Sequence, residues 1–413
     1  MRYFSPIIIN PEEKRNSFTT FKWRHTHETQ TSNSVRELSD PIPVDLLIDI
    51  FSRVPLKSID RFRCVSKHWA SVLRRSDFTE LFWTKSLTRP RLLFTINFNG
   101  KLFFYSVPQP HNPDDNSSLV ATPYQTCSFP KRLLANTFKP LCGLALLMDE
   151  PVICNPATGE FLTLPKVLLE EKDLPNPKEF SKMFCLGYDP VGKQSKVLCM
   201  TSSSFDERLT THLVLTLESR KPLWRKVELK FLFVRNRRMS FGSICINGVL
   251  YFGAEFGKST VMVCFDVRSE KFRFINTDEV MELDRRFELF NYKGKVGIHR
   301  NRYNRYENRY ENRFVWWVLE DARNHKWFKH VLELSPYEEK MVENTKIVGM
   351  TGTGEIVFAS YSHLPISWCR VVFYNMERKT FTRVKIEGFE VEEPRVKKYI
   401  DTFIDYAENV EFM

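Results

Sequence analysis

Residues Ile42–Phe82 read IPVDLLIDIFSRVPLKSIDRFRCVSKHWASVLRRSDFTELF, and this stretch decides how the first part of the chain folds. Pro43 suits the first turn of a helix, and Pro55 ends that helix. Helices this short carry more apolar surface than they can bury among themselves, so the stretch is predicted to be a docking module. In its first part, apolar residues recur at helical spacing and form one face: Leu47, Ile50, Phe51 and Val54.

Small polar residues mark where the later helices of this stretch begin. Ser58 and Ser66 are candidate N-caps, because a serine hydroxyl can accept a hydrogen bond from a free backbone N–H of the first turn. Asp77, followed three residues later by Glu80, has the form of a capping box. Three or four short helices are therefore expected between residues 40 and 84.

The same residues resemble the F-box, the helical module that binds the Skp-type adaptor of a cullin–RING ubiquitin ligase. Residues 42–46, Ile-Pro-Val-Asp-Leu, match the family's opening Leu-Pro-x-Asp-Leu with Ile for Leu. Residues 53–55 match Arg-x-Pro, and residues 61–69, RFRCVSKHW, match its closing Arg-Phe-Arg-x-Val-x-Lys-x-Trp. Asp49 stands where Glu is usual, and Ser66 stands where Cys is common. A generic small helical domain is the alternative.

This resemblance implies roles for individual residues. Trp69 is expected inside the module, where it orients the helices, with Lys67 at its edge. The residues expected to face the adaptor are Pro43, Leu46, Leu47, Ile50, Phe51, Pro55 and Leu56.

Composition and charge narrow the class of protein. The 413 residues carry a net charge of +11, but residues 220–238 hold eight Lys or Arg and one Glu, so the basicity is local. No run of apolar residues is long enough to span a membrane, and the start of the chain does not read as a signal peptide. The protein is therefore expected in the cytoplasm or the nucleus. Its nine Cys lack metal-ligand spacing, which favours buried, reduced thiols without metal or cofactor.

From residue 91 onward the pattern changes to short strands separated by turns such as Asn247-Gly248. A unit repeats with a period near fifty residues: an apolar strand, a polar residue, a turn, and an aromatic residue six positions later. This period is typical of kelch-like β-propeller blades and predicts five or six of them, with a large β-sandwich as the alternative. The pairs are Asn155–Phe161, Glu218–Trp224, Asp266–Phe272, Asp321–Trp327 and Asn375–Phe381.

These segments resemble the type-3 F-box-associated domain of plant F-box proteins, with matching stretches such as VICNPATGEFLTLPK and WVLEDARNHKWFKHV. The resemblance implies a propeller-like fold. The predicted fold class is an α+β multidomain protein, with a small all-α module before a large all-β domain. Its predicted parts are a disordered extension (1–39), the F-box (40–84), the β-domain (90–389) with a low-complexity insertion (301–313), and an acidic amphipathic helix (390–413).

No motif for catalysis stands out. Gly253–Ser259 resembles a phosphate-binding loop but is one residue short and precedes a strand, so it is predicted to be a turn. The sequence therefore predicts a non-catalytic substrate receptor of an SCF ubiquitin ligase, which binds cullin and RING subunits through the adaptor. A nucleic-acid binder using residues 220–238 and a propeller enzyme remain alternatives. The predicted contacts for the unknown target protein are Phe231, Phe233, Arg235, Arg237 and Arg238.

Overall fold

A computed structural model gives the structure of most of the chain. The residues that it describes are 42–98, 101–124, 127–128, 140–147, 151–167, 180–203, 210–218, 222–229, 233, 242–257, 259–277, 287–300, 303–304, 309–360, 369–390 and 399–410. The predicted disordered extension over residues 1–39 lies outside these ranges. Within them, none of the helices has the length and apolarity needed to cross a bilayer.

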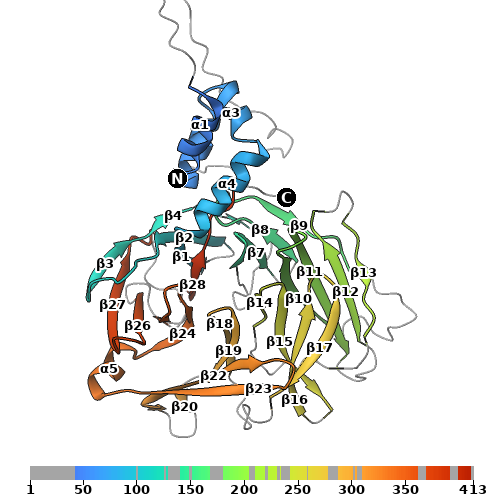
Figure 1. Cartoon of the computed structure of the whole chain (residues 1–413), viewed down its shortest axis with the longest axis vertical. Helices are drawn as coiled ribbons and strands as arrows, with labels where there is room; N and C mark the ends of the chain where they lie inside the picture. The colour runs from blue at the N-terminus through green and yellow to red at the C-terminus, as the bar shows by residue number, and fades with distance from the viewer. Residues whose placement is uncertain are drawn as a thin grey trace, which may run out of the picture. The chain divides into compact units, whose positions relative to one another are not determined.

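The predicted docking module consists of four helices: α1 (Val44–Phe51), α2 (Leu56–Arg63), α3 (Lys67–Val72) and α4 (Ser76–Leu87) (Figure 1). The predicted cap at Ser66 is confirmed, because its hydroxyl accepts a hydrogen bond from the Trp69 N–H at 3.1 Å. The other two predicted starts are wrong. Helix α2 begins directly after Pro55 and not at Ser58, and α4 begins before Asp77, which lies in its first turn.

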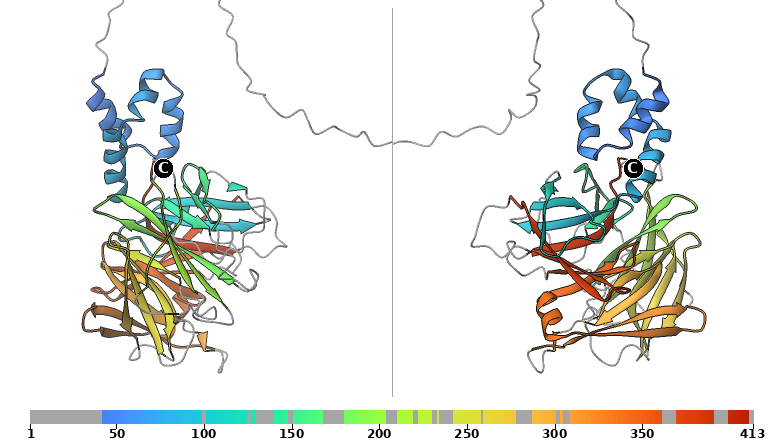
Figure 2. Two further views of the ribbon diagram at one scale, coloured as in Figure 1. Left: turned by 90° about the vertical axis from the view of Figure 1, so that its right-hand side faces the viewer. Right: turned by 60° about the vertical axis from the view of Figure 1, so that its left-hand side comes forward.

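The rest of the described chain forms a six-bladed β-propeller, which confirms the predicted fold class (Figure 1). Each blade is a twisted sheet of antiparallel strands, with one added parallel strand in the sixth, and Figure 2 shows the blades from two other directions. The first three blades are β28 (Tyr399–Tyr406), β1 (Arg91–Phe98), β2 (Lys101–Pro108) and β4 (Thr122–Pro123), with β5 (Cys127–Ser128) also on β2; then β6 (Pro140–Leu141), β7 (Leu144–Leu147), β8 (Val152–Cys154) and β9 (Phe161–Thr163); then β10 (Phe180–Asp189), β11 (Gln194–Ser203), β12 (Thr211–Thr216) and β13 (Arg225–Lys226).

The other three blades follow in chain order, and the innermost strands of all six lie next to one another in a closed ring. A short helix, α5 (Pro336–Met341), joins the last two blades. These blades are β14 (Ile244–Ile246), β15 (Val249–Phe256), β16 (Ser259–Asp266) and β17 (Lys271–Asn276); then β18 (Phe287–Tyr292), β19 (Lys295–Arg300), β22 (Arg313–Asp321) and β23 (Lys326–Glu333); then β24 (Thr345–Met350), β25 (Glu355–Ser360), β26 (Arg370–Asn375) and β27 (Thr380–Glu387), with β3 (Ser117–Val120) paired to β27.

The sequence repeat has a simple structural cause. Its polar residue folds the turn before the fourth strand: the side chain of Asp321, for example, accepts hydrogen bonds from the N–H groups of Arg323 and Asn324 at 2.8 and 3.2 Å. Asn155, Asp266 and Asn375 make the same kind of contact. The aromatic residue of the repeat lies in that fourth strand, or directly before it in the case of Trp224.

The C-terminal segment corrects a prediction. Residues 399–406 form strand β28, not an amphipathic helix, and β28 pairs with β1 to close the ring. Its apolar residues have helical spacing because the strand buries side chains in two different cores: Ile400 lies between blades six and one, whereas Phe403 and Tyr406 lie between blades one and two. Asp405, with a φ of 53°, sits at the bulge that turns Tyr406 to the side of Phe403.

The predicted insertion at residues 301–313 lies between the second and third strands of the fifth blade. Part of it is a two-stranded sheet, β20 (Tyr303–Asn304) with β21 (Arg309–Tyr310), and its last residue, Arg313, begins β22. The turn predicted within residues 253–259 is narrower than that stretch: residues 253–256 end β15, Gly257 turns with a φ of 61°, and Ser259 begins β16.

Candidate functional site

The helical module is organised around three aromatic rings. Phe51 at the end of α1 packs edge-on against Trp69 of α3, with ring centroids 4.9 Å apart. Phe62 of α2 contacts Phe51 at 5.3 Å and Trp69 at 5.6 Å. Trp69 therefore lies where the sequence predicted it, at the junction of three helices.

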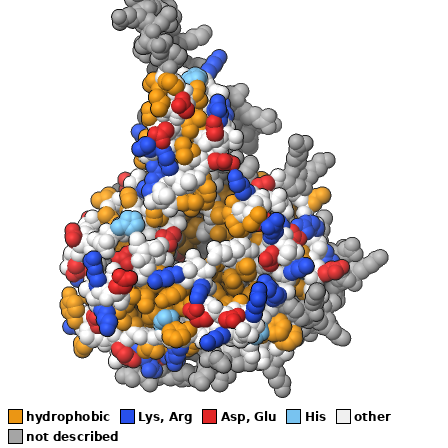
Figure 3. Space-filling model, in the orientation of Figure 1, with side chains coloured by type: hydrophobic (Ala, Val, Ile, Leu, Met, Phe, Trp, Pro, Cys, Tyr) orange, Lys and Arg blue, Asp and Glu red, His pale blue; other side chains and the backbone are white. Residues whose placement is uncertain are grey.

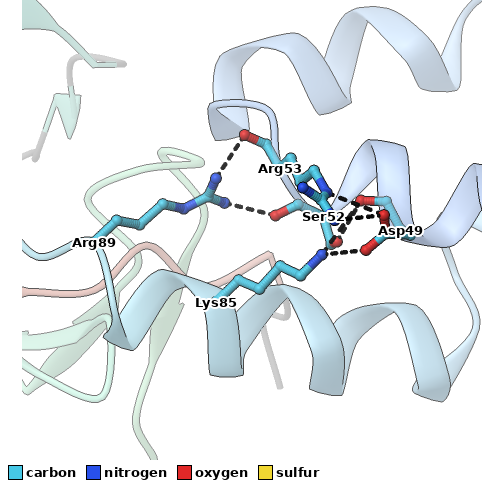
Figure 4. Close-up of polar contacts among 5 residues, drawn as sticks. All are labelled: Asp49, Ser52, Arg53, Lys85 and Arg89. Atoms are coloured by element: carbon cyan, nitrogen blue, oxygen red, sulfur yellow. Dashed lines mark hydrogen bonds and ion pairs between the residues drawn. The ribbon is translucent and has the colours of Figure 1, made fainter.

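A polar clamp joins the C-terminal end of α1 to α4 (Figure 4). Lys85 donates to the Asp49 carboxylate, and Arg53 donates to the same group at 3.0 Å. The hydrogen bonds from Lys85 and then Arg53 lower the pKa of Asp49. Arg89 donates to the backbone carbonyls of Ser52 at 2.8 Å and Arg53 at 2.6 Å, which have no partner within the helix that ends there. The clamp fixes the position of α1.

The seven residues predicted to face an adaptor fall into two groups. Three of them are interior: Leu47 is 3% exposed, Phe51 2% and Leu56 1%. These three are corrected to core residues, because they pack into one apolar cluster with strands of the first two blades. The other four are exposed: Pro43, Leu46, Ile50 and Pro55.

The exposed group defines a candidate docking face on α1. Leu46 and Ile50 are 51% and 49% exposed and lie one helical turn apart, so their side chains share a face. Val65, on the turn between α2 and α3, is a further apolar residue of the module with its side chain in solvent, 60% exposed. Sequence reasoning did not single out Val65. Hydrophobic side chains on the surface of the module are visible in Figure 3.

The apolar core of the helical module is continuous with that of the propeller. One core cluster joins Leu47, Phe78 and Phe82 of the helices to blade residues such as Phe104 and Ala145. The helices thus bury one apolar face within the chain and leave another in solvent. A module that binds a partner while it is anchored on its own chain needs these two apolar faces.

The predicted target contacts are only partly described. Phe231, Arg235, Arg237 and Arg238 lie outside the described residues. Phe233 is 3% exposed and sits in the core between blades three and four, so it is corrected from a surface contact to a core residue. In the same basic stretch, Arg225 pairs with Glu270, whose carboxylate also accepts from Lys196 at 2.7 Å.

Next to Phe233 lies a buried histidine, His212, whose ring centroid is 4.9 Å from that of Phe233. Burial lowers the pKa of His212 from 6.5 to about 4. The unfolded chain takes up this proton near pH 6.5, so stability falls as the pH drops from about 6.5 towards about 4. At pH 5 the loss is about 2 kcal/mol, from about 1.36 kcal/mol per pH unit.

His212→Phe is expected to remove this part of the pH dependence, because a phenyl ring fits among neighbouring phenylalanines and binds no proton. Urea unfolding at pH 7 and pH 5 measures the difference. The variant should lose about 2 kcal/mol less than the wild type between the two values. The exposed His68→Phe is the control. Equal losses for the wild type and His212→Phe would contradict the assignment.

Ionisable groups also meet at the innermost strands. The Lys346 ammonium of β24 lies 3.4 Å from the Glu288 carboxylate of β18. Burial disfavours the charged form of Lys346 and so acts to lower its pKa. The negative charges of Glu288 and then of Asp401 on β28 have the larger combined effect, so the pKa of Lys346 is raised. Burial raises the pKa of the Asp401 carboxyl. The Lys346–Glu288 ion pair connects the last two blades, and Asp401 of the closing strand adds its charge nearby. Within the described ranges, no group of three or more His, Cys, Asp or Glu could hold a metal ion.

Fold and site together define a class: a β-propeller protein with an N-terminal helical docking module. Residues 41–81 match the F-box domain family, and residues 91–407 match the family described as the F-box associated beta propeller domain. The chain belongs to the plant F-box proteins with an F-box associated propeller domain of type 3. For this family, the two domains support a substrate-receptor role in SCF ubiquitin ligases, and the F-box implies binding to a Skp-type adaptor. Its members are typically non-catalytic adaptors.

Relatives match along nearly the whole chain. The putative F-box protein At1g53370 of Arabidopsis thaliana is 44% identical over 396 residues, which are 93% of this chain and 96% of that protein. The F-box protein DOR of the same plant is 40% identical over 91% of this chain and 94% of its own length. A solved Dos1 propeller has a TM-score of 0.34 and 12% identity over 67% of this chain and 64% of that chain, which is too low to add information.

Proposed function

We propose that this chain is itself a substrate receptor of an SCF ubiquitin ligase. The exposed face of α1 docks on the Skp-type adaptor, which connects it to the cullin and RING subunits. The propeller binds a target protein and holds its lysines near the ubiquitin-conjugating enzyme, so the contribution is proximity and orientation, and the chemistry belongs to other subunits. The protein acts in the cytoplasm or the nucleus.

The observation that carries this proposal is the division of apolar residues on α1. Leu47 and Phe51 point into the core shared with the propeller, whereas Leu46 and Ile50 are half exposed. A short helix already supported by its own chain has no structural need for a second apolar face. Exposed apolar side chains gathered on one face mark a protein interface.

The proposed target site lies on the basic stretch of the propeller. The described part of the basic stretch at residues 220–238 presents Leu223, 73% exposed, three residues before the exposed cation Lys226. An apolar side chain beside cations suits an acidic or mixed protein surface. This region therefore remains the proposed target contact, without Phe233.

Co-purification with a Skp-type adaptor tests the proposal. The double variant Leu46→Ala with Ile50→Ala is expected to weaken adaptor binding about 100-fold, since two interface anchors together contribute about 3 kcal/mol. Titration calorimetry on the full chain measures the change. Because both side chains are half exposed, thermal stability should change little.

Leu223→Ala is the control, because it removes an exposed leucine from the propeller and should leave adaptor binding unchanged. Folded wild-type protein that does not bind the adaptor would refute the proposal. Equal affinities for the wild type and the double variant would show that α1 is not the docking face.

A further inference from the structure

A buried carboxylate joins the helical module to the closing strand of the propeller. Glu408 lies two residues after β28 and is 4% exposed. One of its oxygens accepts a hydrogen bond from the Tyr124 hydroxyl at 2.6 Å. The other accepts from the backbone N–H of Leu56 at 3.3 Å. The guanidinium of Arg91, at the start of β1, lies 3.7 Å from the first oxygen.

The contact with Leu56 crosses from the propeller to the helices. Leu56 is the first residue of α2, so its N–H has no partner within that helix. A negative charge at the start of a helix is also favourable. A buried carboxylate is costly unless it is paired, and Glu408 finds a partner on each of three separate parts of the chain. Moving the helical module would leave this charge with fewer partners.

Tyr124 completes the pairing in a defined protonation state. Burial and then the charge of Glu408 raise the pKa of the Tyr124 hydroxyl well above its usual value. The hydroxyl therefore keeps its proton and donates a hydrogen bond to the carboxylate. This hydrogen bond holds one carboxylate oxygen of Glu408 on the propeller.

The segment that carries Glu408 is held against the second blade. The Asn155 side chain donates to the Asn409 carbonyl at 2.8 Å, and the Asn409 side chain donates to the Cys142 carbonyl at 3.3 Å. Both partners belong to the second blade. Val410 enters the core shared by helices and blades. The position of Glu408 is thus set by β28, which closes the ring before it, and by the contacts of Asn409 and Val410 after it.

An exposed ion pair crosses the same boundary and offers a comparison. Lys193, in the turn before β11, donates to Glu80 of α4 at 3.1 Å, with side chains 70% and 68% exposed. Exposed pairs of this kind contribute little, because water screens them and both side chains lose freedom. The buried carboxylate is the stronger candidate for fixing the orientation of the helices.

We propose that Glu408 is a positioning residue that fixes the orientation of the helical module on the propeller. When β28 closes the ring, it brings the Glu408 carboxylate to the start of α2. The helical module, and with it the docking face on α1, therefore acquires its orientation only when the propeller is complete. The consequence for ubiquitin transfer rests on the proposed function. The orientation itself does not, because every contact involved lies within this chain.

Spin-label distance measurements on the full chain test the proposal. Cys64 on the helical module is exposed and takes one label, and Lys271→Cys on β17 takes the other. Burial raises the pKa of Cys142 to about 12 and that of Cys245 to about 11, so these two thiols react slowly. Cys127 is the one cysteine whose side chain the structure does not describe, so Cys127→Ser removes it as a possible labelling site.

The wild type is expected to give one narrow distance distribution. Glu408→Ala should at least double its width, and Glu408→Gln should give an intermediate width, because an amide oxygen can still accept one of the hydrogen bonds. Glu80→Gln, which breaks only the exposed pair, should match the wild type. Adaptor affinity should stay the same in all variants, so a failure of the proposed function would be seen separately.

An unchanged narrow distribution in Glu408→Ala would overturn the proposal. If Glu408→Ala does not fold, Tyr124→Phe provides the test, since it removes only the hydroxyl donor. This variant should fold and broaden the distribution, and a distribution as narrow as that of the wild type would likewise overturn the proposal.

Discussion

A chain that ends before β28 is expected to lose the cooperative fold of its propeller. Deleting residues 399–413 removes the innermost strand of the first blade, which pairs with β1 and fills two inter-blade cores. Both neighbouring blades would then expose apolar surface. The expected loss approaches the whole stability of a domain, about 5–15 kcal/mol. Circular dichroism during urea unfolding should show no cooperative transition at the position of the wild type.

A chain that ends at Val410 is the control, because it keeps β28 and Glu408 and should fold normally. Thr402→Pro adds a point substitution: Thr402 is 7% exposed and pairs with Phe94, and proline removes a backbone donor and clashes inside a strand. A terminal helix lying on the surface would tolerate deletion with a small loss. Normal unfolding of the shortened chain would therefore contradict the role of β28.

Phe51→Ala is expected to destabilise the helical module by about 3–5 kcal/mol, the usual cost of deleting a buried phenylalanine ring. Phe51 is 2% exposed and packs against both Phe62 and Trp69. Its loss leaves a cavity where three helices meet and where the module joins the propeller core. Urea unfolding followed by tryptophan fluorescence measures the change, since Trp69 reports on this site.

Ile50→Ala is the matched control, one residue away on the same helix and 49% exposed. We expect it to weaken adaptor binding and leave stability within about 0.5 kcal/mol of the wild type. Phe51→Ala should show the reverse pattern, with stability lost first. A stability loss below about 1 kcal/mol for Phe51→Ala would show that this ring is not part of the core.

Several features encoded in neighbouring residues were predictable, although the local patterns at Ser58 and Asp77 did not mark helix starts. The position of the F-box follows from a motif that matches without a gap, and Ser66 caps a helix as its local pattern indicates. The blade repeat was readable because a polar residue that folds a turn and an aromatic residue in the next strand are only six positions apart. Local hydrogen bonds and short spacings leave a direct trace in sequence.

Features that depend on distant partners were not predictable. Leu46 and Leu47 are adjacent and identical in type, yet one is half exposed and the other is buried. The difference comes from helices α3 and α4, which pack against one face of α1. Phe233 sits among charged residues in sequence, but it fills a core between two blades. Sequence spacing alone cannot show which face a remote segment will cover.

The sequence by itself determined the class of the protein, because its helical motif and its fifty-residue repeat are both encoded locally. The tertiary structure decided three further points: which side of α1 remains for a partner, that the C-terminal segment is a strand, and that Glu408 contacts α2. The physical reason in all three cases is contact between residues that are apart in the sequence. The strand and the Glu408 contact join residues separated by most of the chain and exist only once the ring of blades has closed, whereas the exposed side of α1 depends on α3 and α4, which pack against it.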